Sequence, residues 1–443
     1  MATSAPSIQR EMVVSMWSLP TRIVFRFCCV YFSLYCVSTQ IFFGLFGSLG
    51  APTRWLFRLH EWVANVLPFV SWTAAHVFRA ELPLVETGSG SGDKTFDWVQ
   101  AFCFLALAAV AATVWSVVDR KRSDHVSLYK WFRLVIRFAL ASQLIAYGAS
   151  KMIPMQMPFP FLTRLVEPYG NFSPMGVLWQ SIGASPAYET FTGCAELLGG
   201  VLLIVPRTTT LGALISMADM TQVFVLNMTY DVPVKLLSFH LLLMSMFLLA
   251  PDLPRLANLF LLNRAAAPSN QPSLFRTLRA NRIAVAAQIL FGTWLVGLNV
   301  YIMSDQWKVF GGGRPKSPLY GIWNVEQFSV DGQIRPALLK DNERWRRAIF
   351  DFNDNISFQR MDDSFTRFGA KIDVNANTLA LTKAADKNWH ATFAFEHSAQ
   401  DQLLLDGEMD ARKIHLQLHL MDRGKFLLVS RGFHWIQEYP FNR

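Results

Sequence analysis

The 443-residue sequence predicts an α-helical polytopic membrane bundle of about seven spans, followed by an antiparallel β-barrel. Hydrophobic residues make up 52% of the chain and charged residues only 16%, whereas soluble domains carry about 25% charged residues. Long apolar runs stop near residue 303, and short alternating segments rich in charge follow. A membrane domain is therefore expected to precede a water-soluble domain.

Seven apolar runs are long enough to cross the hydrocarbon core, which takes about 20 helical residues. They lie at 23–46, 97–118, 131–153, 187–205, 208–228, 233–250 and 283–303. The intervening segment 55–84 mixes charged, aromatic and apolar residues, so we expect an interfacial helix pair there. The predicted regions are an N-terminal membrane segment (1–130), a four-helix core (131–250), a basic loop and last span (251–303), a linker (304–318) and the barrel (319–443).

Basic residues set the expected orientation. The loops at 119–130 and 251–282, together with Arg207, lie on one side of the membrane and are richer in Arg and Lys than the opposite loops. The positive-inside rule then places the N-terminus in the cytoplasm and the C-terminal domain in the periplasm or outside the cell, as in a bacterial inner (plasma) membrane. These loops also account for the net charge of +9, so the lipid bilayer is the expected partner and nucleic acid is not.

Two further features of the sequence predict structure outside the spans. The loop at 154–186 is rich in proline and aromatic residues, and we expect an ordered lid over the outer face. Beyond the glycine-rich linker, side chains alternate with a period of two, as in the apolar set Ile414, Leu416, Leu418 and Leu420. Asp331-Gly332 and Asp406-Gly407 are expected to form tight turns between consecutive strands.

Polar residues are few within the spans, and they gather in the outer half of the membrane. The predicted intramembrane network or ligand site comprises Lys151, Glu196, Asp219, Asn227, Lys235 and His240. One interpretation is a set of ion pairs that fastens helices, with Lys151 or Lys235 neutralising Glu196 or Asp219. The other is a polar cavity in which a carboxylate and His240 bind or protonate a ligand. The histidines are too scattered to predict a metal site.

Part of the membrane region resembles the DoxX family, within the DoxD-like superfamily of small four-helix membrane proteins. The segments RFALASQLIAYGASKMI, AELLGGVLLIVPR and LGALISMADM carry the likeness, through Arg137, Gly148, Lys151, Glu196, Gly199 and Gly200. The resemblance covers about 120 residues and implies a bacterial inner-membrane protein linked to redox or quinone chemistry. The bundle is also similar, more distantly, to the membrane domain of vitamin K-dependent carboxylase.

The C-terminal domain resembles a lipocalin. Gly321 and Trp323 match the Gly-x-Trp of the first strand, and Arg431 is expected to be the arginine that packs on this tryptophan. All three roles are structural, since they close the end of the barrel. The resemblance implies a cavity for one small apolar ligand.

Together these features predict a membrane protein that binds a quinone or lipid at the outer leaflet. It would serve as the membrane subunit of a redox-linked or envelope system, with a redox protein as a candidate partner. No cofactor motif is present, so quinone is the one candidate cofactor and a self-contained enzyme is not expected. The alternatives are a membrane-embedded oxidoreductase or carboxylase-type enzyme with Lys151 or His240 as base, and a structural assembly protein without a ligand.

Overall fold

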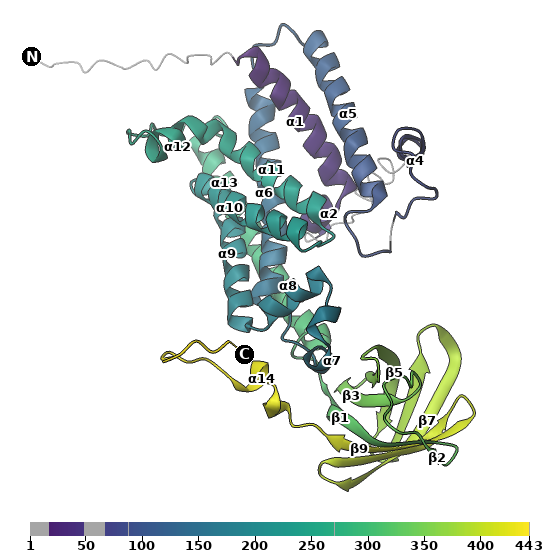
Figure 1. The fold of residues 1–443 in the computed structure, drawn as a ribbon. Coiled ribbons are helices and arrows are strands. Elements are labelled where there is room, and N and C mark those ends of the chain that lie inside the picture. The colour runs from purple at the N-terminus through teal and green to yellow at the C-terminus, as the bar shows by residue number, and fades with distance from the viewer. Residues whose placement is uncertain (1–16, 48–66, 87, 270, 443) are drawn as a thin grey trace, which may run out of the picture. The chain divides into compact units, whose positions relative to one another are not determined.

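The computed structural model describes residues 17–47, 67–86, 88–269 and 271–442. Seven helices of this part are long and apolar enough to cross a membrane, and a closed barrel follows them (Figure 1). The fold class predicted from the sequence is therefore confirmed. The spanning helices are α1 (Leu19–Ser38), α5 (Thr95–Val118), α6 (Val126–Met152), α9 (Pro186–Ile204), α10 (Thr209–Thr229), α11 (Lys235–Leu249) with its extension η2 (Ala250–Asp252) and α12 (Leu253–Phe260), and α13 (Leu278–Phe310).

The first predicted span is interrupted. Helix α1 begins after Ser18, whose side chain accepts the amide hydrogen of Thr21, and ends at Ser38. A short helix, α2 (Gln40–Gly47), continues the run. Much of the predicted interfacial pair at 55–84 lies outside the described residues. The described helix α4 (Leu67–His76) packs on α5 through a small apolar cluster formed by Val70, Ala74, Val99 and Cys103.

Helix α6 is the most enclosed of the spanning helices. In the apolar 18-residue stretch of this helix 78% is buried, compared with 17% in the corresponding stretch of α13. Glycine lets α6 approach α9 closely, because a Cβ on Gly148 would lie 2.6 Å from the amide nitrogen of Leu197.

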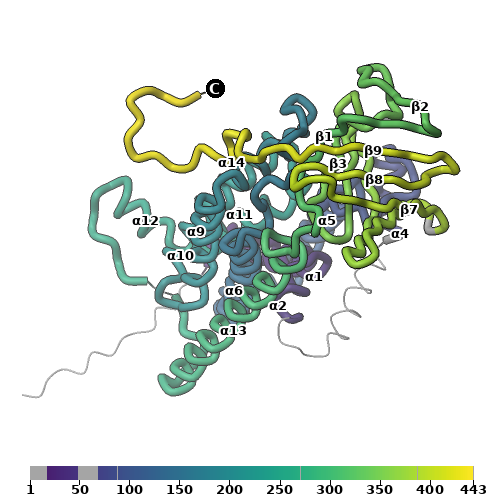
Figure 2. The backbone as a smooth tube through the Cα atoms, turned by 90° about the horizontal axis from the view of Figure 1, so that it is seen from below, coloured from purple at the N-terminus to yellow at the C-terminus, as the bar shows by residue number. Residues whose placement is uncertain are grey.

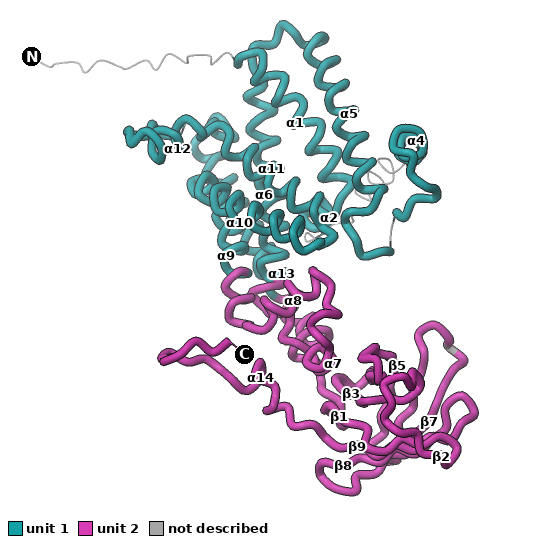
Figure 3. Tube along the Cα trace, in the orientation of Figure 1, with its two compact units in different colours: residues 1–149, 193–300 teal, residues 150–192, 301–443 magenta. Residues whose placement is uncertain are grey.

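The chain forms two compact units (Figure 3): unit 1 comprises residues 1–149 and 193–300, and unit 2 comprises residues 150–192 and 301–443.

The barrel is an antiparallel meander of eight strands in which each strand pairs with the next, and a ninth, very short strand pairs only with the first (Figure 2). Pairing of the first strand with the last closes it, as in the partners Phe328 and Leu416. The small strand β2 extends only the end of β1, beyond the Asp331-Gly332 turn predicted from the sequence. The strands are β1 (Lys316–Val330), β2 (Gln333–Ile334), β3 (Trp345–Phe352), β4 (Asn355–Arg360), β5 (Phe365–Asp373), β6 (Thr378–Lys383), β7 (Asp386–Ala399), β8 (Gln402–Met409) and β9 (Arg412–Leu420).

Three predicted boundaries are corrected. The linker is 311–315 rather than 304–318, because α13 continues to Phe310 and β1 begins at Lys316. Asp406-Gly407 is not a turn but part of β8, where the absent side chain of Gly407 lets the strand lie against the backbone of Thr392 and Phe393. The last strand ends at Leu420, so the chain beyond it is an appendage of the barrel.

Apolar side chains line the barrel interior. Its core includes Trp323, Trp345, Phe350, Phe358 and Phe393, all at most 5% exposed. Large aromatic side chains thus form much of the core between the strands, and the cavity that the lipocalin resemblance implies stays a prediction.

Of the three residues predicted to close the end of the barrel, Gly321 and Trp323 lie at its closure and Arg431 does not. The Trp323 indole donates to the Leu319 carbonyl at 3.0 Å, and Trp323 lies opposite Leu420 at the closure between β1 and β9. A Cβ on Gly321 would lie 2.4 Å from the end of the Leu420 side chain, which would have to move to admit a larger residue. The prediction that Arg431 packs on Trp323 is wrong. Arg431 lies beyond the last strand and stacks on Phe441 of its own segment, 4.3 Å from the ring centre.

The loop between α6 and α9 belongs to unit 2 and packs on the barrel. It contains α7 (Leu162–Val166), η1 (Tyr169–Asn171) and α8 (Pro174–Gly183). The Leu162 amide donates to the buried Asp351 carboxylate of β3 at 2.9 Å, and the Gln359 side chain donates to the Val166 carbonyl at 3.2 Å. The expected lid is therefore an ordered segment docked on the barrel domain.

Candidate functional site

Three of the polar residues predicted inside the membrane, Asn227, Lys235 and His240, have well-defined partners. The Asn227 side chain donates to Ser238 at 3.0 Å, which ties α10 to α11. The Lys235 ammonium pairs with Asp231 at 3.0 Å and lies 3.7 Å from Asp93. This pairing corrects the expectation that Lys235 neutralises Glu196 or Asp219, since nearer carboxylates at the ends of α10 and before α5 take that role.

His240 is buried and contacts two tyrosines of α1. It stacks on Tyr35 with ring centres 3.5 Å apart, and its Nε2 is hydrogen-bonded to the Tyr31 hydroxyl at 2.7 Å. Its Nδ1 lies 2.6 Å from the Leu236 carbonyl. Both ring nitrogens are thus engaged, so the histidine joins α11 to α1.

The remaining predicted residues are divided between the units. Glu196 is buried and Asp219 half-buried in unit 1, whereas Lys151 lies in unit 2. Glu189, in the first turn of α9, is fully buried and accepts the Met157 amide hydrogen at 2.7 Å.

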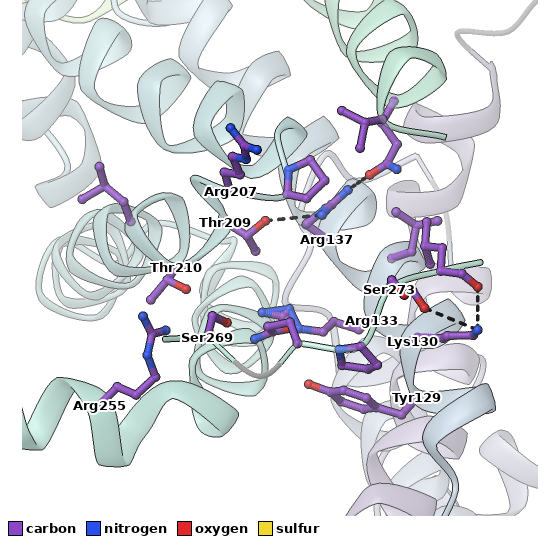
Figure 4. A pocket seen from close by; sticks show the side chains of 18 of the residues that line it. Tyr129, Lys130, Arg133, Arg137, Arg207, Thr209, Thr210, Arg255, Ser269 and Ser273 are labelled. Carbon is purple, nitrogen blue, oxygen red and sulfur yellow. Dashed lines mark hydrogen bonds between the residues drawn. The ribbon is translucent and has the colours of Figure 1, made fainter. Parts of the chain in front are cut away.

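A different cavity of about 690 Å³ lies within unit 1. Helix α6 supplies one wall, because Lys130, Arg133 and Arg137 are spaced three and four residues apart and share a face. The turn between α9 and α10 adds Arg207, and α12 adds Arg255. Of the described residues, five cationic side chains and no acidic one line this cavity (Figure 4), which we call the arginine pocket.

Two of the arginines are buried without a carboxylate in contact. Arg133 and Arg137 are each 7% exposed, and neither forms a salt bridge with a described residue. Arg133 donates to the Leu248 carbonyl at 3.1 Å, whereas Arg137 donates to Thr209 at 3.3 Å and to Gln288. Each Nε lacks a hydrogen-bond partner in the described structure. Buried cations with spare donors favour an anion in the cavity.

The nearby acid is already engaged. Asp252 is buried and acts electrostatically on Arg133, yet its carboxylate binds other groups. It accepts from Thr210 at 2.7 Å, from Arg255 at 2.5 Å and from Gln271 at 3.2 Å. Asp252 therefore neutralises Arg255 first and leaves the excess positive charge on α6.

The chain after α12 closes over part of the pocket. The Lys130 ammonium donates to the Leu274 carbonyl at 2.5 Å, with the Ser273 carbonyl at 3.5 Å (Figure 4). On the other side, the Arg255 guanidinium donates to the Ala267 carbonyl at 2.7 Å. The segment predicted only as a basic loop thus contributes a wall of the cavity.

The rest of the lining is partly polar and partly apolar. The apolar part includes Leu134, Leu211, Leu214, Leu256, Leu259, Phe260, Ala284 and Val285. Some of these side chains are open to the exterior of the bundle, since Leu211 is 52% exposed and Leu259 is 53% exposed. A cavity that joins cations to an apolar, outward-facing wall suits a molecule with an anionic head and a hydrocarbon tail.

Sequence reasoning missed this pocket, although a signal was present. Arg133 and Arg137 stand one turn apart in an otherwise apolar helix, where a charge costs several kcal/mol unless it is paired or functional. Of the two, only Arg137 was singled out in the sequence, as one of the residues that carry the DoxX resemblance. Its partner Gln288 is 151 residues away, so the spacing alone could not reveal the cavity.

Comparison with known proteins finds one relative and no family model or solved structure that matches. The chain is 33% identical over 124 residues to the uncharacterized protein YwoB of Bacillus subtilis (strain 168). The match covers 28% of this chain and 79% of YwoB. The DoxX resemblance remains a prediction. Over the matched residues, the chain belongs to the same family as YwoB.

Proposed function

We propose that this membrane protein binds an anionic lipid, with a phosphate or carboxylate head, in the arginine pocket. The observation that carries the proposal is the pair of buried guanidiniums, Arg133 and Arg137, which have spare N–H donors and no carboxylate in contact. Phosphate and carboxylate oxygens satisfy such donors in a planar, charge-assisted geometry. The apolar wall at Leu211 and Leu259 would receive the chain of the lipid.

The pocket favours a lipid over a quinone. A quinone head is neutral, so it does not offset the cost of burying two guanidiniums. The positive-inside rule places the basic loops, and with them the pocket, at the cytoplasmic leaflet instead of the outer leaflet suggested by Glu196 and His240. A redox partner and a bacterial inner-membrane location remain predictions that this pocket does not require.

Native mass spectrometry of the purified full-length protein tests the proposal. The probes are phosphatidate, a long-chain fatty acid, a zwitterionic phosphatidylcholine, a short-chain quinone and inorganic phosphate. We expect phosphatidate, the fatty acid or both to bind, whichever head group the pocket selects, and phosphatidylcholine and quinone to bind much more weakly. Inorganic phosphate separates the contribution of the head from that of the tail.

The matched variants are Arg137→Met in the pocket and Arg279→Met on the exposed first turn of α13. Only the first should reduce binding of the anionic lipid. Equal binding of anionic and zwitterionic lipids, or a preference for quinone that survives Arg137→Met, would contradict the proposal.

A further inference from the structure

The C-terminal segment after the barrel presents large apolar side chains to the exterior. Phe433 is 77% exposed, Trp435 90%, Ile436 80% and Tyr439 84%. Four such residues within seven positions exceed the scattered apolar exposure usual on a soluble domain. The segment therefore needs an apolar partner.

The segment is fixed to the barrel at its base. Met421 donates its amide hydrogen to the Ile322 carbonyl at 2.8 Å, and Arg423 donates to the Tyr320 hydroxyl at 2.7 Å. Phe426 packs with Leu162 in the cluster that docks α7 on the barrel. The segment consequently starts from a defined point on unit 2 (Figure 3).

Its outer part is organised around one arginine. The Arg431 guanidinium stacks on Phe441 and lies within hydrogen-bond distance of His434 at 3.2 Å and Gln437 at 3.3 Å. These contacts close residues 431–441 into a loop. Trp435 and Tyr439 project from this loop while its polar groups bond to one another.

Strand order shows which end of the barrel carries the segment. Helix α13 spans the membrane and ends at Phe310, and β1 begins at Lys316. The five residues between them extend at most about 18 Å, so the start of β1 stays close to the end of this helix. Because β9 is antiparallel to β1, its end at Leu420 lies opposite Trp323 at the middle of β1, and the chain continues toward the start of β1, as the bond from the Met421 amide to the Ile322 carbonyl shows. The C-terminal segment thus leaves the barrel on the side of the strand that the connection to α13 enters.

We infer that residues 427–441 insert into the interface of the bilayer that α13 crosses. Tryptophan and tyrosine prefer this layer because their rings are apolar and their N–H or O–H groups remain wet. Arg431, Arg423 and Lys425 add positive charge that suits phosphate head groups. The segment thereby becomes a further attachment of the barrel to the membrane, beside α13 and the loop between α6 and α9.

A fluorescent probe in the full-length protein tests this inference. Ile436→Cys and Ala385→Cys are made in a chain whose five native cysteines are replaced with alanine, labelled with an environment-sensitive dye and reconstituted in phosphatidylcholine–phosphatidylglycerol nanodiscs. Ala385 is exposed in the turn between β6 and β7, at the opposite end of the barrel, and is the matched control.

At position 436 we expect blue-shifted emission, several-fold weaker quenching by aqueous iodide than at position 385, and strong quenching by a lipid that carries a nitroxide near its head group. Iodide quenching equal to that at position 385 would overturn the inference. Protection from iodide without quenching by the nitroxide lipid would also overturn it, because it would show that the segment docks on protein.

Discussion

Replacing Arg133 with methionine is expected to stabilise the ligand-free protein. Its guanidinium is buried, and its one hydrogen bond within the described structure goes to the Leu248 carbonyl. Removing a buried charge recovers a desolvation cost of several kcal/mol, partly offset by attraction to Asp252. Loss of a hydrogen bond to a charged group costs about 1.5–3 kcal/mol. The free energy of unfolding should therefore rise by about 1–3 kcal/mol.

The same substitution is expected to weaken lipid binding. Truncating one member of a buried charge pair typically costs about 2–5 kcal/mol. An anionic lipid held by Arg133 should therefore lose at least about 30-fold in affinity. Stability and affinity would then change in opposite directions, which a merely structural arginine does not produce.

Two measurements on the full-length Arg133→Met variant check this result. Thermal unfolding in detergent without added lipid reports stability, and titration with phosphatidate or a long-chain fatty acid followed by native mass spectrometry reports affinity. Arg279→Met, which removes an exposed charge, serves as the control and should change neither. A loss of stability together with unchanged lipid binding would refute the reasoning and identify Arg133 as a structural contact to α11.

Burial raises the pKa of Asp351 from 3.8 to about 6, so in that pH range the folded protein holds a proton that the unfolded chain releases. The contribution of Asp351 to stability is greatest below pH 4 and is lost as the pH rises through 6. Asp351→Asn should remove this pH dependence and stabilise unit 2 above pH 6 by up to about 3 kcal/mol. Thermal melts from pH 4 to 8 measure it, and an unchanged pH profile would contradict it. Gly148→Val should destabilise the bundle by about 1–3 kcal/mol, because the new Cβ would clash with Leu197. Gly297→Val, where the space is open, is the control, and equal melting temperatures for the two variants would show that α6 and α9 can separate freely.

The elements were predictable from local pattern, whereas the contacts among them were not. Apolar length identifies the spanning helices and a period of two identifies β9, since both reflect the environment of consecutive residues. The arginine pocket depends on Arg137 meeting Gln288, and the docked loop depends on Leu162 meeting Asp351, 189 residues away. Such pairs leave no local period. The polar residues of the outer half were conspicuous in sequence, yet the structure pairs Lys235 with the nearby Asp231 and bonds His240 to the distant Tyr31.

The division of unit 2 into two stretches of chain has a consequence for biosynthesis. Residues 150–192 are made first, and residues 193–300 must follow before any barrel strand exists. At ~5–20 residues per second this delay is on the order of ten seconds. During it Leu162 and its apolar neighbours have no barrel to cover them. The ribosome therefore completes the loop's docking surface last, and a nascent chain arrested before β3 would expose a hydrophobic segment that chaperones or proteases can recognise.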